Sequence, residues 1–136
     1  MDTKEILVFK AFVDAINKAN VTELEKLISE DHIFIDSGRR KVKGSENVIR
    51  GWKSYFEMFP DYKIEIEDII HSKETIGAFG TATGTYNGKR GLIDENIIKM
   101  PAAWRAIIKD DIVKLWQVYA DWTEGTKIIE EDEQTE

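Results

Sequence analysis

The sequence predicts an α+β domain in which helices pack on one face of a curved antiparallel sheet. In residues 4–60, apolar side chains mostly recur at helical spacing, whereas after Tyr62 they alternate with polar ones as in strands. The second half also contains Gly77, Gly80 and Gly84, and glycines inside strands typically mark bends. Helices and strands that separate along a chain of 136 residues are typical of one α+β domain.

Two helices are predicted at the start of the chain. The first covers Lys4 to Ala19, and Asn20 interrupts it. Thr22, followed three residues later by Glu25, has the form of a capping box and predicts a short second helix antiparallel to the first. The apolar face of the first helix consists of Val8, Phe12, Ala15, Ile16 and Ala19.

A strand and an aromatic helix are predicted next. Residues 31–36 alternate, which places His32 and Asp36 on the same face of a strand. A third helix is predicted from Ser45, a plausible N-cap, to the helix-breaking Pro60. Its apolar stripe consists of Val48, Ile49, Trp52, Tyr55, Phe56 and Phe59.

Four strands are predicted to follow in succession. Asn87-Gly88 is typical of a two-residue hairpin, and Asp110-Asp111 tolerates a tight turn. The predicted strands cover residues 62–70, 75–86, 97–109 and 112–122.

The negative charge is concentrated at the end of the chain. The formal charge is -7, and residues 124–136 hold six acidic side chains and one basic side chain. We therefore expect a folded domain over residues 1–123 that is almost neutral, followed by an acidic, flexible tail over residues 124–136.

Composition sets several function classes aside. Phosphate binding needs an excess of cations, so the acidic balance argues against nucleic acid as a partner. The absence of cysteine excludes disulfides and thiolate chemistry, and two distant histidines, His32 and His71, make a zinc site implausible. No signal-peptide or membrane-span pattern is present. We expect a cytoplasmic protein with no cofactor, metal or membrane partner.

Two aspartates are candidates for acid–base chemistry. Asp36 ends an apolar strand in phase with His32, although Asp36-Ser37-Gly38 is also ordinary turn chemistry. His32 is a further catalytic candidate, to orient Asp36 or to donate to a substrate oxygen, and its alternative role is that of a satisfied, partly buried histidine. Asp121 shares a predicted strand face with Gln117 and Tyr119, although it also fits a solvated strand end.

Large aromatic side chains are frequent enough to line a pocket as well as to fill a core. Several of them carry a polar atom that suits an oxygenated ligand. The candidate ligand-binding residues are Trp52, Tyr55, Phe59, Trp104, Gln117 and Tyr119.

The order of four motifs resembles the SnoaL-like polyketide cyclase branch of the nuclear transport factor 2-like superfamily, which includes ketosteroid isomerase-like proteins. The motifs are Phe59-Pro60-Asp61-Tyr62, the glycine-rich segment 80–88, Trp104-Arg105-Ala106 and the segment 111–119. The resemblance covers residues 4–122 and implies a cone-shaped fold with a deep apolar cavity, often dimerised through the sheet.

Within that family, the resemblance implies cyclases, isomerases, epoxide hydrolases and dehydratases, and in the cyclases an aspartate on the last strand acts as acid or base. The family often places an acid directly after the tryptophan and again three residues later, where this chain has Gln117 and Ala120. Glutamine hydrogen-bonds but does not transfer protons.

The sequence thus predicts a small-molecule cavity protein, with two functional alternatives. The first is a cofactor-independent isomerase or cyclase that uses a buried Asp36 or Asp121 for proton transfer on an apolar carbonyl compound. The second is a non-catalytic ligand-binding or dimeric interaction domain whose pocket is filled by side chains. The expected partners are a small apolar ligand and a second copy of the chain, bound through the sheet.

Overall fold

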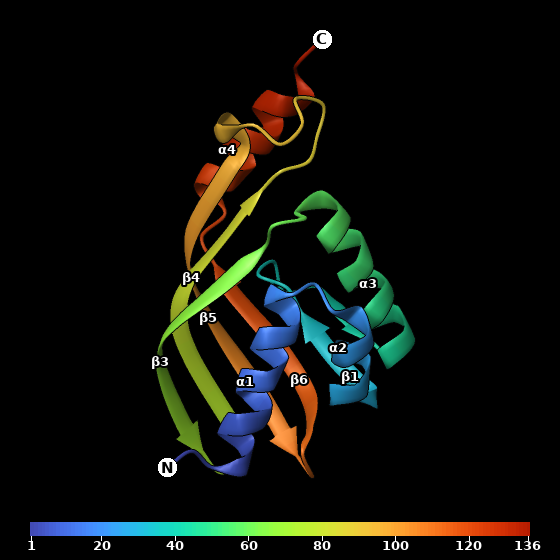
Figure 1. Ribbon diagram of the computed structural model, residues 1–136, viewed down its shortest axis with the longest axis vertical. Helices are drawn as coiled ribbons and strands as arrows, with labels where there is room; N and C mark the ends of the chain where they lie inside the picture. Colours follow the sequence, from blue (N-terminus) through green and yellow to red (C-terminus); the bar gives the residue numbers. More distant parts are fainter.

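The computed structural model describes residues 1–136 and consists of four helices, a short 3-10 turn and six strands (Figure 1). None of the helices has the length and hydrophobicity of a membrane span. The helices are α1 (Lys4–Asn17), α2 (Val21–Leu27), α3 (Ser45–Met58) and α4 (Thr123–Glu133), with η1 (Asp94–Asn96) as the 3-10 turn. The strands are β1 (Ile28–Ile35), β2 (Lys41–Lys43), β3 (Lys63–Ser72), β4 (Thr75–Thr85), β5 (Ile97–Lys109) and β6 (Ile112–Ala120).

The six strands form one curved sheet in the order β2-β1-β6-β5-β4-β3. All neighbours are antiparallel except β1 and β6, which run parallel. The β3–β4 pairing shifts register between Ile66 and Asp68, and Gly80 lies close to this point, where a Cβ atom would come within 1.9 Å of the Glu65 carbonyl oxygen. A glycine at 80 therefore permits the close backbone approach, and the predicted curved α+β fold is confirmed.

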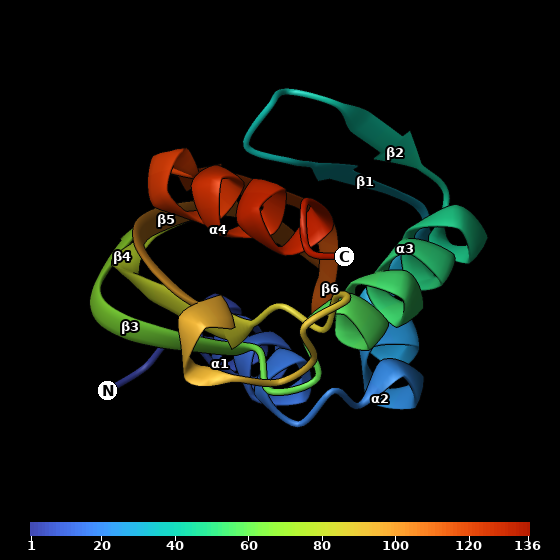
Figure 2. The same ribbon diagram turned by 90° about the horizontal axis from the view of Figure 1, so that it is seen from above.

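The helices bury the inner, concave face of the sheet. The α1 helix packs on β3, β4, β5 and β6, and α3 packs on β1 and β2 (Figures 1 and 2). At the centre of the core, the Phe12 ring lies 4.7 Å from the Trp116 ring, and Trp104 is also fully buried. The sequence predicts this packing, because its helical segments have one apolar face and its strands point every second side chain toward that face.

The first helix also protects the open edge of the sheet. Asn17, the last residue of α1, donates from Nδ2 to the Ile64 carbonyl oxygen at 3.0 Å. The Ile64 N–H donates back to Asn17 Oδ1 at 2.7 Å. One side chain thus satisfies both backbone groups of a residue on edge strand β3.

Two helix starts differ from the sequence prediction. The α2 helix begins after Asn20, whose Oδ1 accepts from the Glu23 N–H at 3.1 Å, so Thr22 lies inside the helix and the predicted capping box is wrong. Ser45 is the first helical residue of α3, and the N-cap is Gly44, which has a φ of 91°.

The predicted Asn87-Gly88 hairpin is also wrong, because β4 ends at Thr85 and β5 begins only at Ile97. The Asn87 N–H donates to the Met58 carbonyl oxygen at 2.7 Å, which directs the chain toward the end of α3. The Asp110-Asp111 turn is confirmed, since both residues have positive φ.

The predicted flexible tail is largely a helix. The α4 helix runs alongside β5 in Figure 2, and its Gly125 lies against Ile98. Near its end, Asp132 is only 1% exposed and accepts from the N–H groups of Lys89 and Arg90, both at 2.7 Å. Asp132, which the sequence analysis assigned to a solvated tail, therefore anchors α4 to the β4–β5 connection.

Candidate functional site

A pocket of about 160 Å³ lies between α3, the β1–β2 hairpin and the inner face of the sheet. Of its 14 lining residues, 11 are hydrophobic, so a ligand inside would mainly contact carbon. Its hydrophobic wall consists of Phe34, Val42, Val48, Trp52, Tyr55, Tyr62, Ala82, Met100, Val118, Ala120 and Trp122.

The periodicity of the elements explains how these side chains meet. On α3, Val48, Trp52 and Tyr55 follow one another at i, i+4 and i+7, which puts them on one helix face. On β6, Val118 and Ala120 are two residues apart and so point to the same side of the sheet.

Asp36 is the one carboxylate in the pocket wall. It follows the last residue of β1, is half-buried, and accepts at Oδ1 from the N–H groups of Gly38 and Arg40, both at 2.9 Å. The turn role that the sequence left open is therefore present, and Asp36 also lies at the pocket, as the acid–base role would require. Both hydrogen bonds fall on Oδ1, so Oδ2 has no hydrogen-bond partner within the protein.

Two tyrosines supply hydroxyl donors in the same wall. The rings of Tyr55 and Tyr62 lie 4.9 Å apart at 89°. Burial raises the pKa of Tyr62 to about 12 and raises the pKa of Tyr55 as well, so both hydroxyls stay protonated at neutral pH. Tyr62 was not among the predicted site residues. The turn that carries it is fixed by the preceding residue, Asp61, whose carboxylate accepts hydrogen bonds from the N–H and the hydroxyl of Thr85.

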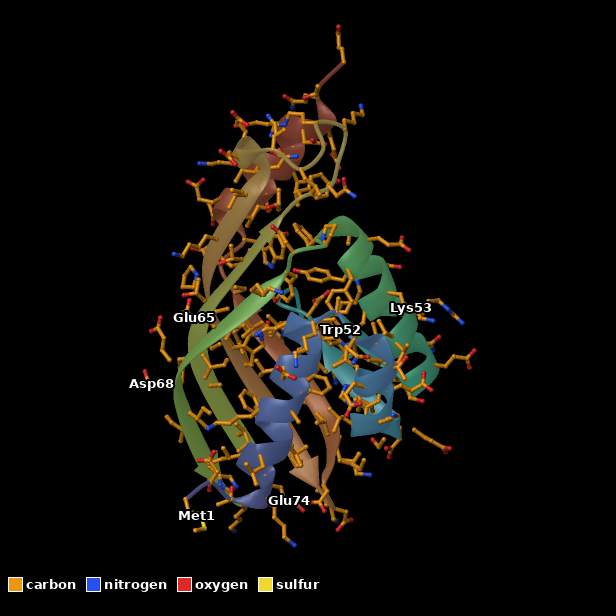
Figure 3. The ribbon with its side chains drawn as sticks, in the orientation of Figure 1. Met1, Trp52, Lys53, Glu65, Asp68 and Glu74 are labelled. Atoms are coloured by element: carbon orange, nitrogen blue, oxygen red, sulfur yellow. The ribbon has the colours of Figure 1, made fainter.

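Trp52 lies in the same wall and is almost completely buried. It is 6% exposed, and its Nε1 is buried without a hydrogen-bond partner. Its ring stacks on Phe56 at 5.5 Å and meets Phe34 edge-on at 5.6 Å. Figure 3 shows Trp52 in the region between α1 and α3.

His32 lies in the core and does not line the pocket. It is fully buried, and its Nδ1 lies 2.7 Å from the Val113 carbonyl oxygen. Burial lowers the pKa of His32, so the ring is neutral and Nδ1–H donates to that carbonyl. The catalytic role predicted for His32 beside Asp36 is therefore corrected, and the structure shows the alternative role of a buried, hydrogen-bonded histidine, which joins β1 to β6.

Asp121 also lies outside the pocket. Its Oδ1 accepts from the Thr123 N–H at 3.0 Å and from the Thr123 hydroxyl at 2.6 Å, and these bonds lower the pKa of Asp121. It is exposed and secures the first turn of α4. The structure therefore assigns this aspartate the second of its two predicted roles, a solvated strand end.

The predicted ligand-binding residues divide between four places. Trp52 and Tyr55 line the pocket, and Phe59 lines a smaller pocket next to it. Trp104 is 1% exposed in the core. Gln117 and Tyr119 lie on the outer face, where Gln117 Oε1 accepts from Arg105 Nη2 at 3.0 Å. All three are corrected as pocket residues: Trp104 is packed into the core, and the inner face of β6 carries Trp116 and Val118 in place of Gln117 and Tyr119.

The pocket has a simple charge distribution. Asp36 is its single acidic side chain, and no Lys, Arg or His contributes to the wall. No group of three or more His, Asp or Glu side chains in the protein is arranged to hold a metal ion. The wall therefore combines one carboxylate with neutral side chains that carry a donor group, namely Ser37, Trp52, Tyr55, Tyr62 and Trp122.

The sequence profile of the SnoaL-like domain matches residues 9–106, which is more than half of the chain. The protein belongs to the SnoaL-like family. No curated protein sequence matches this SnoaL-like domain.

Solved structures of similar fold include two proteins described as SnoaL-like polyketide cyclases. The one from Jannaschia sp. CCS1 is 16% identical, with 94% of this chain and 92% of that chain covered and a TM-score of 0.81. The one from Shewanella putrefaciens CN-32 is 17% identical, with 96% and 99% covered and a TM-score of 0.81. An epoxide hydrolase from M. tuberculosis is 12% identical, with 95% and 91% covered and a TM-score of 0.77. At these identities the likeness shows the fold alone.

Proposed function

We propose that this SnoaL-like domain is a cofactor-independent enzyme of the isomerase or cyclase type, in which Asp36 transfers a proton on an apolar carbonyl compound. The observation that carries the proposal is the position of Asp36, a lone carboxylate in a wall of mostly hydrophobic side chains. The SnoaL-like family membership and the cyclases and epoxide hydrolase of similar fold support this class of chemistry.

The wall has the groups that such a step needs. The Asp36 carboxylate takes a proton from the carbon next to the carbonyl group, and the electron pair of the C–H bond moves toward the carbonyl oxygen. The negative charge on that oxygen needs nearby donors, and the hydroxyls of Tyr55 and Tyr62 in the pocket wall would supply them. Return of the proton to a different atom completes an isomerisation.

Hydrogen–deuterium exchange tests the proton transfer without knowledge of the natural substrate. In D₂O, the protein should speed deuterium uptake at the carbons beside the carbonyl of cyclohexanone, and NMR or mass spectrometry measures that uptake. Asp36→Asn should slow the protein-dependent exchange about 10²- to 10⁴-fold, because asparagine accepts no proton.

The matched control is Asp121→Asn, because Asp121 lies outside the pocket and asparagine still accepts a hydrogen bond from Thr123. This variant should exchange as fast as the wild type. Equal rates in the wild type and in Asp36→Asn would show that Asp36 is not the base.

A non-catalytic binding domain is the second candidate, and one observation favours it. Both hydrogen bonds to Asp36 come from its own turn, which gives the side chain a structural role without any ligand. Native mass spectrometry of protein purified from its own host separates the two candidates. A bound small molecule that Asp36→Asn retains, together with the absence of protein-dependent exchange, would support a binding domain.

A further inference from the structure

One position in the pocket wall has no side chain. Gly51 lies in the middle of α3 and is one of the 14 lining residues of the pocket. It is the one exposed residue among them, because all the others are buried or half-buried. The wall is therefore most open to solvent at Gly51.

The helix itself does not require a glycine at this position. Glycine in a helix interior destabilises the fold relative to alanine, because it loses more backbone freedom when the chain folds. Gly51 does not have the positive φ that favours glycine, and a Cβ atom there would meet nothing within 4 Å. Neither the backbone conformation nor close packing thus accounts for the missing side chain.

Helix geometry shows where a side chain at position 51 would lie. Val48 precedes Gly51 by three residues and Tyr55 follows it by four, so the three positions share one side of α3, and both neighbours line the pocket. Helical side chains lean toward the N-terminal end of their helix, so a side chain at position 51 would lie over the turn that carries Val48. A larger side chain there would narrow the open side of the pocket.

We infer that Gly51 forms the mouth of the pocket and that its missing side chain sets the size of the molecule that enters. The inference rests on the proposed function in one respect, because it assumes that a small molecule enters this pocket. It adds a specificity-determining position that takes no part in the proton transfer. A ligand whose ring fills the interior would extend any further substituent past Gly51 into solvent.

A single thiol tests this position directly. The chain contains no cysteine, so Gly51→Cys introduces the only thiol in the protein. Benzyl methanethiosulfonate then attaches a benzyl group to its sulfur through a disulfide bond. Apolar cavities of about 150 Å³ bind benzene-sized molecules, so the benzyl ring fits a pocket of about 160 Å³.

Lys53→Cys is the matched control. Lys53 is exposed, does not line the pocket and lies about 200° around the helix from Gly51. Figure 3 shows it on the outer side of α3. In NMR spectra, the benzyl protons on Gly51→Cys should show contacts with wall residues outside α3, such as Val42 and Val118. The benzyl protons on Lys53→Cys should show none.

Labelling should also change deuterium exchange in cyclohexanone. Benzyl-labelled Gly51→Cys should lose the exchange that the unlabelled variant shows, because the attached ring occupies the pocket. A methyl group attached in the same way should reduce the exchange less, since the narrower group leaves part of the mouth open. Labelled Lys53→Cys should exchange as fast as it does before labelling.

The stability of a further variant tests the open space without any label. Gly51→Ala should unfold at a higher temperature than the wild type, because alanine favours the helix and its Cβ atom meets nothing. A lower unfolding temperature would show that the position is closed, and this would overturn the inference.

The outcomes separate this inference from the proposed function. A benzyl group on Gly51→Cys that makes no contact with the wall outside α3, or full exchange after benzyl labelling, overturns the role of Gly51 and leaves proton transfer by Asp36 standing. Contacts with the wall in a protein that shows no exchange before labelling support the mouth at Gly51 and overturn the catalytic role.

Discussion

His32 shows how burial decides the role of a single side chain. Its ring is fully buried, and burial lowers the pKa of its imidazole below the ordinary value of 6.5, while the hydrogen bond to Val113 acts in the opposite direction and is the weaker effect. The neutral ring joins β1 to β6 through Nδ1–H at the place where the register of the two strands shifts. A protonated His32 would instead place a charge in the core.

We expect this histidine to make the fold sensitive to mild acid. Below about pH 6.5 the unfolded chain takes up a proton at this residue and the folded protein does not, so its contribution to stability is complete above that pH and falls below it. Urea unfolding at about pH 7.5 and about pH 5.5 measures this, and the loss at the lower pH, about one unit below the ordinary pKa of histidine, is at most about 1.4 kcal/mol. His32→Asn, which keeps a donor and does not titrate, should lose less stability between the two pH values than the wild type; an equal loss would contradict the prediction.

At the scale of the elements, two glycines of β4 that look alike in the sequence differ in the structure. A Cβ atom at position 80 would lie 1.9 Å from the Glu65 carbonyl oxygen of β3, whereas a Cβ atom at Gly77 would meet nothing within 4 Å. The bend of the sheet therefore depends on Gly80 and leaves Gly77 free to vary.

Gly80→Ala should lower the free energy of unfolding by about 1–3 kcal/mol, because the backbones of β3 and β4 must separate. Gly77→Ala is the matched control in the same strand, and it should change stability by less than about 1 kcal/mol. Denaturant unfolding compares the two variants. Similar losses of stability in both would show that the close approach at position 80 does not limit the fold.

The sequence predicts elements well where their signals are local. The Ile97–Lys109 strand is predicted at both ends, because its alternation is contained within the strand itself. The α4 helix is not predicted, because its anchor, Asp132, finds its partners Lys89 and Arg90 more than 40 residues earlier in the chain. Charge composition alone therefore made a docked helix look like a solvated tail.

The same distinction holds for the candidate site. Trp52 and Tyr55 lie in the pocket wall because the apolar stripe of a helix has only one buried side. The last strand carries large side chains on both faces, so alternation alone does not reveal that Val118 points inward and Tyr119 outward. For the same reason the sequence did not decide which of the two candidate aspartates faces the pocket. The structure places only Asp36 there.

At the scale of the whole molecule, the outer face of the sheet carries an exposed apolar row. Phe79, Ala103 and Tyr119 are aligned across β4, β5 and β6, and the two aromatic residues are 47% and 50% exposed. Next to this row, Arg105 donates hydrogen bonds to Gln117. The polar groups of this pair are therefore already satisfied if another molecule covers the sheet surface. We propose that two copies of the protein pair through this face.

Sedimentation at micromolar concentration should therefore give twice the chain mass of 15.7 kDa. The double variant Phe79→Glu and Tyr119→Glu should sediment as a monomer, because it places charges in the centre of the contact. Leu7→Glu is the control, since Leu7 is 56% exposed on α1 and lies away from the sheet surface. A wild type that sediments as a monomer would overturn the proposed pairing.

The hydrogen bonds between Asn17 and Ile64 bear on the direction in which assemblies can grow. They occupy both backbone groups of Ile64, so a strand from another molecule that aligns with β3 meets a gap in the ladder there. At the opposite edge, β2 is three residues long and carries the exposed Lys41 and Lys43, which repel an identical strand. A new strand would therefore be interrupted at Ile64 on one border and repelled by lysines on the other, and the proposed contact through the sheet surface would close at two copies without extending into a fibril.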